Sequence, residues 1–435
     1  MTDRTSGTRV ITVGELARVE GEGALMIQLE GERVVDVQLR IFEPPRLFES
    51  MLRGRAAAEA PDITSRICGI CPVAYQMSAC HAIERALGVR CDGALRDLRR
   101  LLYCGEWIES HVLHMTMLHA PDFLGAPDVM TLSEKHPEQV HAALQMKKAG
   151  NAIVNALGGR EIHPINVRLG GFYRAPRRDE LSCLLPDLEA ARDSAEELLD
   201  WCATFEFPDL ERDTEYVALQ HPDEYPMNEG RIASTRGLDI DALDWEEHFI
   251  EEQVAHSTAL HAKIVERGPY ICGPQARFAL NAERLSHRAQ QAAARVGLTP
   301  ETGKNPFRSI LVRGVEVIYA FDEAIRIIES YQPPPVSAIE ARPQSGRGAA
   351  ATEAPRGLLY HRYDLDADAN ILEAKIVPPT SQNQCSIEDD LRAIAPTLAA
   401  LPHAAARARA EHAIRNYDPC ISCATHFLEL TIERK

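Results

Sequence analysis

Two pairs of cysteines near opposite ends of the chain place the strongest constraint on its fold. Cys68 and Cys71 lie in the stretch RICGICP, and Cys420 and Cys423 lie in the stretch DPCISCATH. A spacing of two residues lets both sulfurs of a pair face one ion, and two pairs supply the four thiolates that soft metals prefer. A helix that begins after Cys71 would also favour the thiolate form. The pattern predicts a metal site with four cysteine ligands.

The separation of the two pairs bears on the kind of metal. A structural zinc site with four cysteines is the commonest use of this pattern and is the leading interpretation of the pairs alone. Structural zinc usually joins pairs that lie about 15–20 residues apart, whereas Cys71 and Cys420 are separated by nearly the whole chain. A thioredoxin-like redox pair is disfavoured because neither pair lies in a βαβ pattern. The spacing therefore counts against zinc and leaves it open as an alternative.

The charge of the chain limits its partners. Its 47 basic and 64 acidic residues give a formal net charge of −17. Because this charge repels phosphate backbones and anionic lipid, we expect no nucleic-acid and no membrane partner. Residues 1–16 show no export signal, and no stretch reaches the roughly 20 apolar residues of a membrane span, so we expect a cytoplasmic protein. The composition, 45% apolar and 26% charged over 435 residues, is typical of a soluble globular protein.

Hydrophobic periodicity predicts a mainly helical core that follows a short β region. In residues 1–60, the segments 24–29 and 35–41 alternate as a β-hairpin. Residues 61–330 form the helical core, with a loop-rich insert near 158–176 between clusters of glycine. Helices are expected at 73–87, 92–119 (capped by Asp92), 134–157, 178–204, 245–266 and 280–296.

The remainder of the chain is expected to be a mixed region. A stretch rich in proline, glycine and alanine, 331–352, is the best linker candidate. The C-terminal region, 353–426, contains expected strands at 356–363 and 371–377 and a helical segment at about 387–417, and residues 427–435 follow as a tail. Helix outweighs strand throughout, which predicts an α+β chain that is predominantly helical.

Seven further cysteines stand alone in the sequence. We expect them to be small buried hydrophobic residues of the core rather than metal ligands. They are Cys80, Cys91, Cys104, Cys183, Cys202, Cys272 and Cys385.

Several motifs in a fixed order resemble a known family, the large catalytic subunit of [NiFe] hydrogenases. They are RVEGEG at 18–23, RICGICP at 66–72, GGR at 158–160, APRG at 354–357 and the terminal DPCxxCxxH. The resemblance covers essentially the whole chain and implies a long-helix bundle core with small peripheral β-sheets. It also implies reversible heterolytic cleavage of H2 into protons and electrons. The first motif, with IFEPP at 41–45, is most similar to the cytoplasmic bidirectional enzymes linked to NAD(P), in particular the sulfhydrogenase type.

The resemblance implies roles for the four cysteines. All four would bind nickel, with Cys68 and Cys420 as terminal ligands. Cys71 and Cys423 would bridge to an iron that carries one carbon monoxide and two cyanides, a Ni–Fe(CO)(CN)2 centre. These ligands suit the reaction, because splitting H2 needs an electrophilic metal with a vacant position beside a base.

Other residues acquire roles in the same way. Arg356 would lie beside the iron and its cyanides, since a buried anion needs a charged or hydrogen-bonding partner. Pro355 and Thr380 would complete the cofactor-binding set. Glu20 is similar to the glutamate that carries protons from a terminal thiolate, and Asp418 is similar to an aspartate of the surrounding network.

A second metal ion is implied nearby. Glu49, the carbonyl of Ile376 and His426 resemble ligands of a Mg²⁺ ion, for which histidine is the unusual ligand. In a neighbouring helix, Glu109-Ser110-His111 departs from the His-Asp-His of the oxygen-tolerant, membrane-bound branch. His111 and His114 share one helical face and either line the site or are ordinary core histidines.

The resemblance also implies partner proteins. A maturation endopeptidase would cut after His426 once nickel chaperones have loaded the metal, which makes 427–435 a removable tail. Since this chain has no CxxCxxC-type spacing among its lone cysteines and no GxGxxG fingerprint, the iron–sulfur clusters must lie on another chain. We therefore expect an obligate iron–sulfur small subunit and, beyond it, diaphorase subunits with FAD and NAD(P).

Three rival functions follow from the same features. A hydrogen-sensing regulatory subunit keeps the metal site but generally lacks a cleaved tail. A non-catalytic scaffold similar to a subunit of respiratory complex I lacks the four cysteines. A zinc-stapled binding protein would require the other motif residues to match by coincidence.

Overall fold

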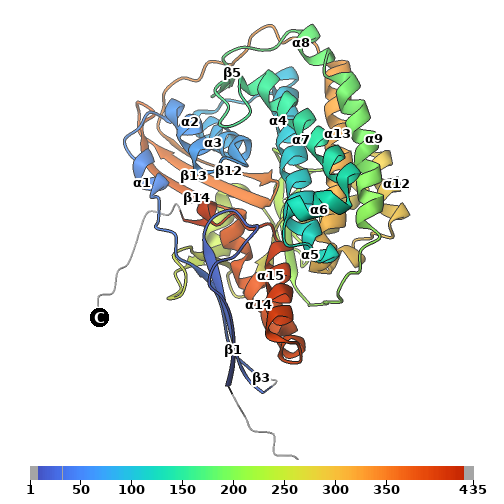
Figure 1. The fold of residues 1–435 in the computed structure, drawn as a ribbon. Helices are drawn as coiled ribbons and strands as arrows, with labels where there is room; N and C mark the ends of the chain where they lie inside the picture. Colours follow the sequence, from blue (N-terminus) through green and yellow to red (C-terminus); the bar gives the residue numbers. More distant parts are fainter. Residues whose placement is uncertain (1–7, 32, 426–435) are drawn as a thin grey trace, which may run out of the picture.

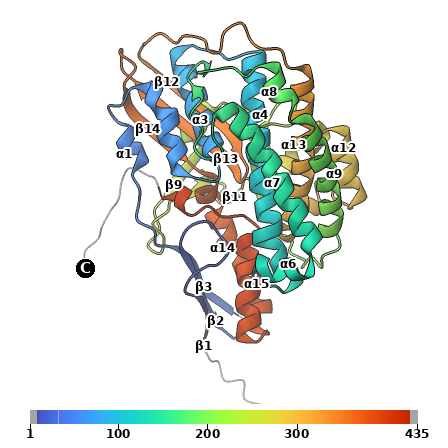
Figure 2. The same ribbon diagram turned by 45° about the horizontal axis from the view of Figure 1, so that its top comes forward.

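The computed structural model describes residues 8–31 and 33–425, and a bundle of long helices forms its larger part (Figure 1). The helices α4 (Ala94–Leu113), α7 (Pro137–Gly158), α9 (Leu185–Cys202) and α13 (Ser309–Ser330) pack side by side in both views (Figures 1 and 2). Backbones of α4 and α7 meet where Gly105 faces Gly150, because a Cβ at Gly150 would lie 2.8 Å from the Gly105 carbonyl oxygen. The predicted predominantly helical fold with small sheets is confirmed.

The sequence analysis missed α13, which is buried on nearly every side. A helix that is buried on nearly every side, with charged residues such as Arg313 and Glu316 among the buried ones, has no clear amphipathic period for a sequence pattern to reveal. The expected helix at 92–119 begins at Ala94 instead, after Gly93, and Asp92 makes no cap. Asp92 instead accepts a hydrogen bond from Arg90, and α4 continues through a π-helical segment, His114–His119.

Other predicted helices are present in shorter pieces. The segment 134–157 corresponds to the end of α6 (Val129–Lys135) and to α7, and 178–204 corresponds to α8 (Arg178–Ser182) and α9. The segment 280–296 holds the end of α11 (Pro274–Asn281) and all of α12 (His287–Arg295). The insert near 158–176 is loop-rich as predicted, with only the two-residue strands β4 (Val167–Arg168) and β5 (Gly171–Phe172). Three further short helices are α1 (Phe48–Leu52), α2 (Ala60–Thr64) and α5 (Ala120–Leu124).

The predicted helix at 245–266 is wrong. This segment contains α10 (Trp245–His248) and two antiparallel strands, β9 (Phe249–Glu252) and β10 (His261–Ile264). Trp245 and Phe249 stack on each other and share a core cluster with Ile264. Burial against neighbouring strands therefore overrides the helical preference of the local sequence. A four-stranded sheet lies beside them, in the order β11 (Tyr270–Ile271), β6 (Glu215–Gln220), β7 (Arg231–Ser234), β8 (Asp239–Ile240).

A three-stranded antiparallel sheet lies against the helix that follows the first cysteine pair. It consists of β12 (Gly346–Ala354), β13 (Gly357–Leu365) and β14 (Ile371–Val377), and α3 (Pro72–Leu87) packs on β12 and β13. The predicted strands near 356–363 and 371–377 are confirmed. The stretch predicted as a linker has no helix or strand over 332–345, but from Gly346 its residues belong to β12. The division into domains stays a prediction.

A second antiparallel sheet extends from the body of the molecule (Figure 1). It contains β1 (Thr8–Val13), β2 (Gly23–Glu30) and β3 (Arg33–Ile41), so the predicted hairpin is confirmed and gains one strand. It packs against α14 (Pro379–Ala399) and α15 (His403–Arg415). The expected helical segment at 387–417 is thus two helices, separated just before Pro402, which precedes the first turn of α15.

Two further expectations concern the burial of the lone cysteines and the presence of membrane-spanning helices. Six of the seven lone cysteines are buried as expected, and Cys183 is the exception because its turn at the end of α8 is exposed. Among the helices of residues 8–425, none combines the length and apolar character needed to cross a bilayer.

Candidate metal centre

The first cysteine pair is held by the start of a helix. Cys71 directly precedes Pro72, the first residue of α3, and the backbone N–H groups of Ile70 and Cys71 donate to Cys68 Sγ over 3.3 and 3.4 Å. Both cysteines are buried. The carboxylate of Glu106, on α4, accepts hydrogen bonds from the N–H groups of the two residues that follow Pro72 (2.7 and 3.1 Å). Local hydrogen bonds and one neighbouring helix therefore fix this pair.

The second pair lies after α15, where contacts from distant segments hold it. The hydroxyl of Thr380, in the first turn of α14, accepts a hydrogen bond from the Cys420 N–H (2.9 Å). The guanidinium of Arg46 donates to the carbonyl of Ile67, just before the first pair, and to the carbonyl of Ser422, inside the second pair. Arg46 thus clamps the two motifs together. The sequence analysis did not assign it a role, although it stands three residues before Glu49.

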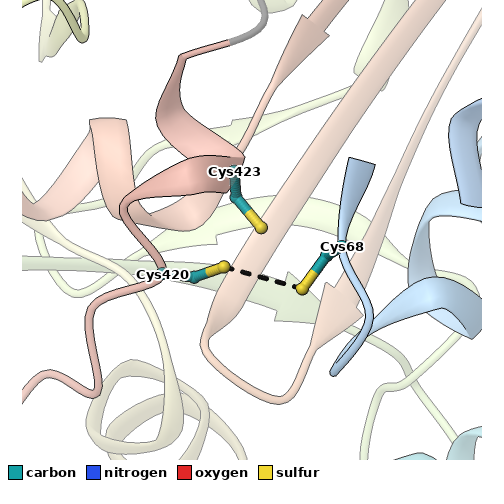
Figure 3. A group of neighbouring side chains, drawn as sticks. All are labelled: Cys68, Cys420 and Cys423. Atoms are coloured by element: carbon teal, nitrogen blue, oxygen red, sulfur yellow. Dashed lines mark hydrogen bonds between the residues drawn. The ribbon is translucent and has the colours of Figure 1, made fainter. Parts of the chain in front are cut away.

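The two pairs meet although they lie at opposite ends of the chain. The sulfurs of Cys68 and Cys420 are 3.6 Å apart, and those of Cys68, Cys420 and Cys423 all lie within 4.8 Å of one another (Figure 3). The thiol of Cys71 interacts with the other three. Hydrogen bonds from the neighbouring thiols, above all that of Cys420, hold the pKa of Cys68 well below its ordinary value, whereas burial raises the pKa of Cys420. The four cysteines form one buried cluster of thiols that is ready to share a metal.

The N-terminal segment reaches this cluster through Glu20. Its carboxylate Oε2 accepts hydrogen bonds from the Cys420 thiol (2.9 Å) and from the Ser422 N–H (3.1 Å), and its backbone pairs in parallel with Cys420. Gly21 permits this approach: its φ is +86°, and a Cβ there would lie 2.8 Å from the Ile421 Cβ. Only glycine accommodates both conditions without displacement of the neighbouring chain. Glu20 therefore lies directly against one thiol of the cluster.

A buried arginine faces the second motif from the turn between β12 and β13. Arg356 Nε donates to the carbonyl of Asp418 (2.7 Å), and Nη2 donates to Asp418 Oδ1 (3.1 Å). Burial raises the pKa of Asp418, and Arg356 opposes this shift. Within the described part of the chain, Arg356 Nη1 and Asp418 Oδ2 are buried and have no hydrogen-bond partner. Such unpaired polar atoms are costly, so their presence indicates further polar groups, an acceptor or anion for Arg356 and a donor for Asp418.

A charged network that the sequence analysis did not identify supports this turn. Arg277 donates to the carbonyl of Pro355 (3.0 Å) and forms an ion pair with Glu316, which also bonds His111 (2.9 Å). Although burial opposes it, the positive charge of Arg277 lowers the pKa of Glu316 to about 2. His114 bonds the carbonyl of Arg415 (2.7 Å). Both histidines thus belong to buried networks of the core, which favours the core interpretation over ligands that line the cluster.

Two of the three residues predicted for the Mg²⁺ site lie together. Glu49, on α1, and Ile376, on β14, are buried, and Glu49 Oε1 accepts a hydrogen bond from the backbone N–H of Ile376 (2.7 Å). The predicted contact uses the carbonyl of Ile376, which the structure does not test. His426 and the tail 427–435 lie outside the described residues.

Comparisons with known proteins agree on one family. The family described as nickel-dependent hydrogenase matches residues 46–143 and 273–426. The alpha subunit of sulfhydrogenase 1 from Pyrococcus furiosus is 31% identical over 97% of this chain and 98% of its own length. The beta subunit of the NAD-reducing hydrogenase HoxS from Cupriavidus necator is 25% identical over 97% of this chain and 95% of its own length.

Solved structures show the same relationship. A crystal structure of an NAD⁺-reducing [NiFe]-hydrogenase in the H2-reduced state superimposes with a TM-score of 0.87 and 26% identity, covering 96% of this chain and 99% of the other. A [NiFeSe] hydrogenase variant from Desulfovibrio vulgaris Hildenborough gives a TM-score of 0.80 at 22% identity, over 97% of this chain and 100% of the other, which shows a shared fold.

Proposed function

Because the chain belongs to the nickel-dependent hydrogenases, as a catalytic large subunit, we propose that its four clustered cysteines hold a Ni–Fe(CO)(CN)2 centre that cleaves H2 reversibly. The observation that carries the proposal is the approach of Cys68 and Cys420, which are 352 positions apart in sequence and have sulfurs 3.6 Å apart. Thiolates suit a soft metal pair, and when bound the centre supplies the electrophilic position at which H2 is split.

The residues around the cluster fit such a centre. Cys68 and Cys420 would be terminal ligands to nickel, and Cys71 and Cys423 would bridge to iron. The free Nη1 of Arg356 is a buried charged donor with no partner among the described residues, which suits a cyanide on the iron. The main chain of Pro355 would help to position the cyanide ligands. The hydroxyl of Thr380, which is held by a hydrogen bond from the Cys420 N–H, would do the same.

We assign the movement of protons to Glu20. Its Oε2 lies 2.9 Å from Cys420 Sγ, which is hydrogen-bond distance for a proton that leaves this thiol. Replacement Glu20→Gln keeps the shape and removes the proton acceptor. We expect H2 turnover to fall at least about 100-fold while nickel and iron remain bound.

A matched control is Glu22→Gln, which makes the same change at an exposed position two residues away. Its H2 turnover should equal that of the unmodified enzyme. Turnover by Glu20→Gln within about twofold of the unmodified enzyme would contradict the assignment.

Asp418 would hold Arg356 in place through the two hydrogen bonds between them. We further propose that Glu49, the carbonyl of Ile376 and His426 bind a Mg²⁺ ion that ties α1 to β14. The contact between Glu49 and Ile376 supports this proposal, since it already brings an oxygen ligand beside the strand.

The electrons require a partner chain. We propose that an iron–sulfur small subunit docks over the groove between α1, α2 and the insert at 158–176. Met51, Ile165 and Tyr173 line this groove and are more than half exposed (54%, 55% and 64%). Apolar side chains gathered at a surface hollow are typical of an interface. His163 of the insert bonds the carbonyl of Ser65, so the groove adjoins the first cysteine motif.

The names of the relatives support NAD(P) as the electron acceptor. Because they include sulfhydrogenase and NAD-reducing enzymes, we propose a cytoplasmic complex in which diaphorase subunits pass electrons to NAD(P). A maturation endopeptidase and nickel chaperones would act on the chain before the complex is complete, and residues 427–435 would be removed then.

The experiment that tests the function uses the chain coexpressed with its small subunit and nickel-maturation proteins. H2-dependent reduction of a viologen dye should be present in the unmodified complex and absent in Cys420→Ser, which should also lack nickel. The control Cys183→Ser removes an exposed thiol and should keep full activity. Nickel-free protein with full activity, or activity in Cys420→Ser, would overturn the proposal.

A further inference from the structure

A second group of metal-ligating side chains lies apart from the four cysteines. His256 and His261 stand in and after the loop between β9 and β10, and Cys385 and Glu388 stand three positions apart on α14. One ligand atom each from His256, His261 and Glu388 lie within 4.8 Å of one another. The thiol of Cys385 lies 3.3 Å from His261 Nδ1.

The contacts within this group are close to the spacing of a metal site. His256 Nε2 lies 2.8 Å from Glu388 Oε1, and the two imidazole rings meet edge to face with centroids 5.7 Å apart. Ligand atoms around a tetrahedral zinc ion lie about 3.3–3.8 Å apart, as follows from metal–ligand bonds of ~2.0–2.3 Å.

His261 lies inside the group. This histidine is 2% exposed, and its Nδ1, which faces the Cys385 thiol, is the nitrogen that would bind the ion. His256 is 21% exposed in its side chain and opens the group to solvent, which gives an ion access.

Charges near the group are already paired. Lys263 forms an ion pair with Glu252 (2.6 Å), and Arg392 pairs with Asp389 (2.8 Å) as well as with Glu388 (3.3 Å). The Glu388 carboxylate is oriented by the N–H of Leu39, on β3 (2.9 Å). A thiolate ligand at Cys385 requires that the binding ion displace the thiol proton.

We propose that His256, His261, Cys385 and Glu388 bind one zinc ion. Two imidazoles, one thiolate and one carboxylate are a donor set of intermediate softness, which suits zinc better than magnesium or calcium. The ion would join the β9–β10 hairpin to α14 and, through Glu388, to β3. The site is independent of H2 chemistry, so its test does not rest on the proposed function.

The test measures zinc in the coexpressed complex after passage over a mild chelating resin. We expect one zinc ion more per complex in the unmodified protein than in Cys385→Ser, and zinc-edge X-ray absorption should show one sulfur among nitrogen and oxygen ligands. The control Cys202→Ser changes a buried thiol at the end of α9, in the helical core, and should keep the zinc. Equal zinc in Cys385→Ser and the unmodified protein would overturn the proposal, as would four sulfur ligands, which would place the ion at the other cluster.

A second measurement avoids variants that fail to fold. Titration of the nickel-loaded, zinc-depleted complex, in which the four-cysteine cluster is already occupied, with Co²⁺ should produce a thiolate-to-cobalt absorption band and release one proton per ion bound near neutral pH. Cobalt that binds without this band, or that desalting removes, would contradict the assignment.

Discussion

The two halves of the cysteine cluster are built in different ways. Cys68 and Cys71 are fixed by hydrogen bonds within their own motif and by Glu106 of the adjacent α4. The second pair depends on side chains from segments that are far away in sequence, Glu20, Arg46 and Thr380. The difference indicates that the first half can form with the helical core, whereas the second half forms only when both ends of the chain meet. Such an order would leave the centre open for metal loading before it closes.

The largest effect should come from blocking this closure. Gly21→Ala places a Cβ 2.6 Å from Glu43 Oε1 and forces a side chain onto a φ of +86°. We expect the second pair to be displaced, with nickel content and H2 turnover reduced at least about 100-fold. The helical circular dichroism of the core should be unchanged.

Gly14→Ala is the matched control, since a Cβ there meets nothing within 4 Å. Normal nickel content in Gly21→Ala would show that the second pair does not depend on the N-terminal segment.

A smaller loss should follow from weakening the clamp between the halves. Arg46→Lys keeps the positive charge but removes the planar guanidinium. The lysine ammonium cannot bond the carbonyls of Ile67 and Ser422 at the same time in the way that Arg46 does. We expect roughly a tenfold loss of nickel retention, measured as nickel released to a chelator over time. Arg90→Lys changes an exposed arginine and serves as the control. Equal release rates in both variants would argue against a clamp.

A substitution that weakens the support of the first cysteine pair should lower the stability of the protein rather than its metal content. In Glu106→Gln, an amide N–H2 replaces one of the two oxygens that accept the Val73 and Ala74 N–H groups. The lost bond at a buried position should cost about 1–3 kcal/mol, measured as faster hydrogen exchange at the start of α3. Glu109→Gln makes the same change one helical turn away. If Glu106→Gln leaves this exchange unchanged, the local account of the first half is wrong.

The smallest effect concerns pH and the buried network behind Arg356. Burial lowers the pKa of His111 to about 4, against roughly 6.5 in an unfolded chain. The unfolded state therefore binds more protons between these values, so stability must fall as the pH falls through this range. Between pH 7 and 5.5 the loss should be about 1 kcal/mol for each such histidine.

Denaturant unfolding of His111→Gln should show a shallower dependence on pH than the unmodified protein. His287→Gln, at an exposed position, should leave the dependence unchanged. An identical slope in His111→Gln would mean that His111 is not held neutral in the folded protein.

The same contrast explains what sequence reasoning could predict. The motifs around Cys68 and Cys420 and the hairpin at 24–41 carry local patterns, so their spacing and periodicity were informative. Residues whose roles depend on long-range packing left no such pattern: Arg277 and Glu316 lie in buried helices, and the helix α13 is buried on nearly all sides. Arg46 acts through backbone carbonyls of two distant motifs, which only the folded chain brings together.

Two strand regions also have a structure that the local sequence pattern did not predict. The segment 245–266 has a helical composition, but burial of Phe249 and Ile264 against neighbouring strands decides its structure. The beginning of β12 has the small residues of a linker, because it packs closely on α3: a Cβ at Gly348 would lie 2.1 Å from the carbonyl oxygen of Ala82. In both places tertiary contacts, rather than local preference, determine the backbone.

The central claim is that both ends of the chain close around a nickel–iron centre. Infrared spectroscopy of the complex, coexpressed with the maturation proteins, tests it most directly, because no protein group absorbs where metal-bound carbon monoxide and cyanide do. The account predicts one carbonyl band and two cyanide bands, which disappear in Cys420→Ser and persist in Cys183→Ser. Absence of these bands in nickel-loaded complex would contradict it.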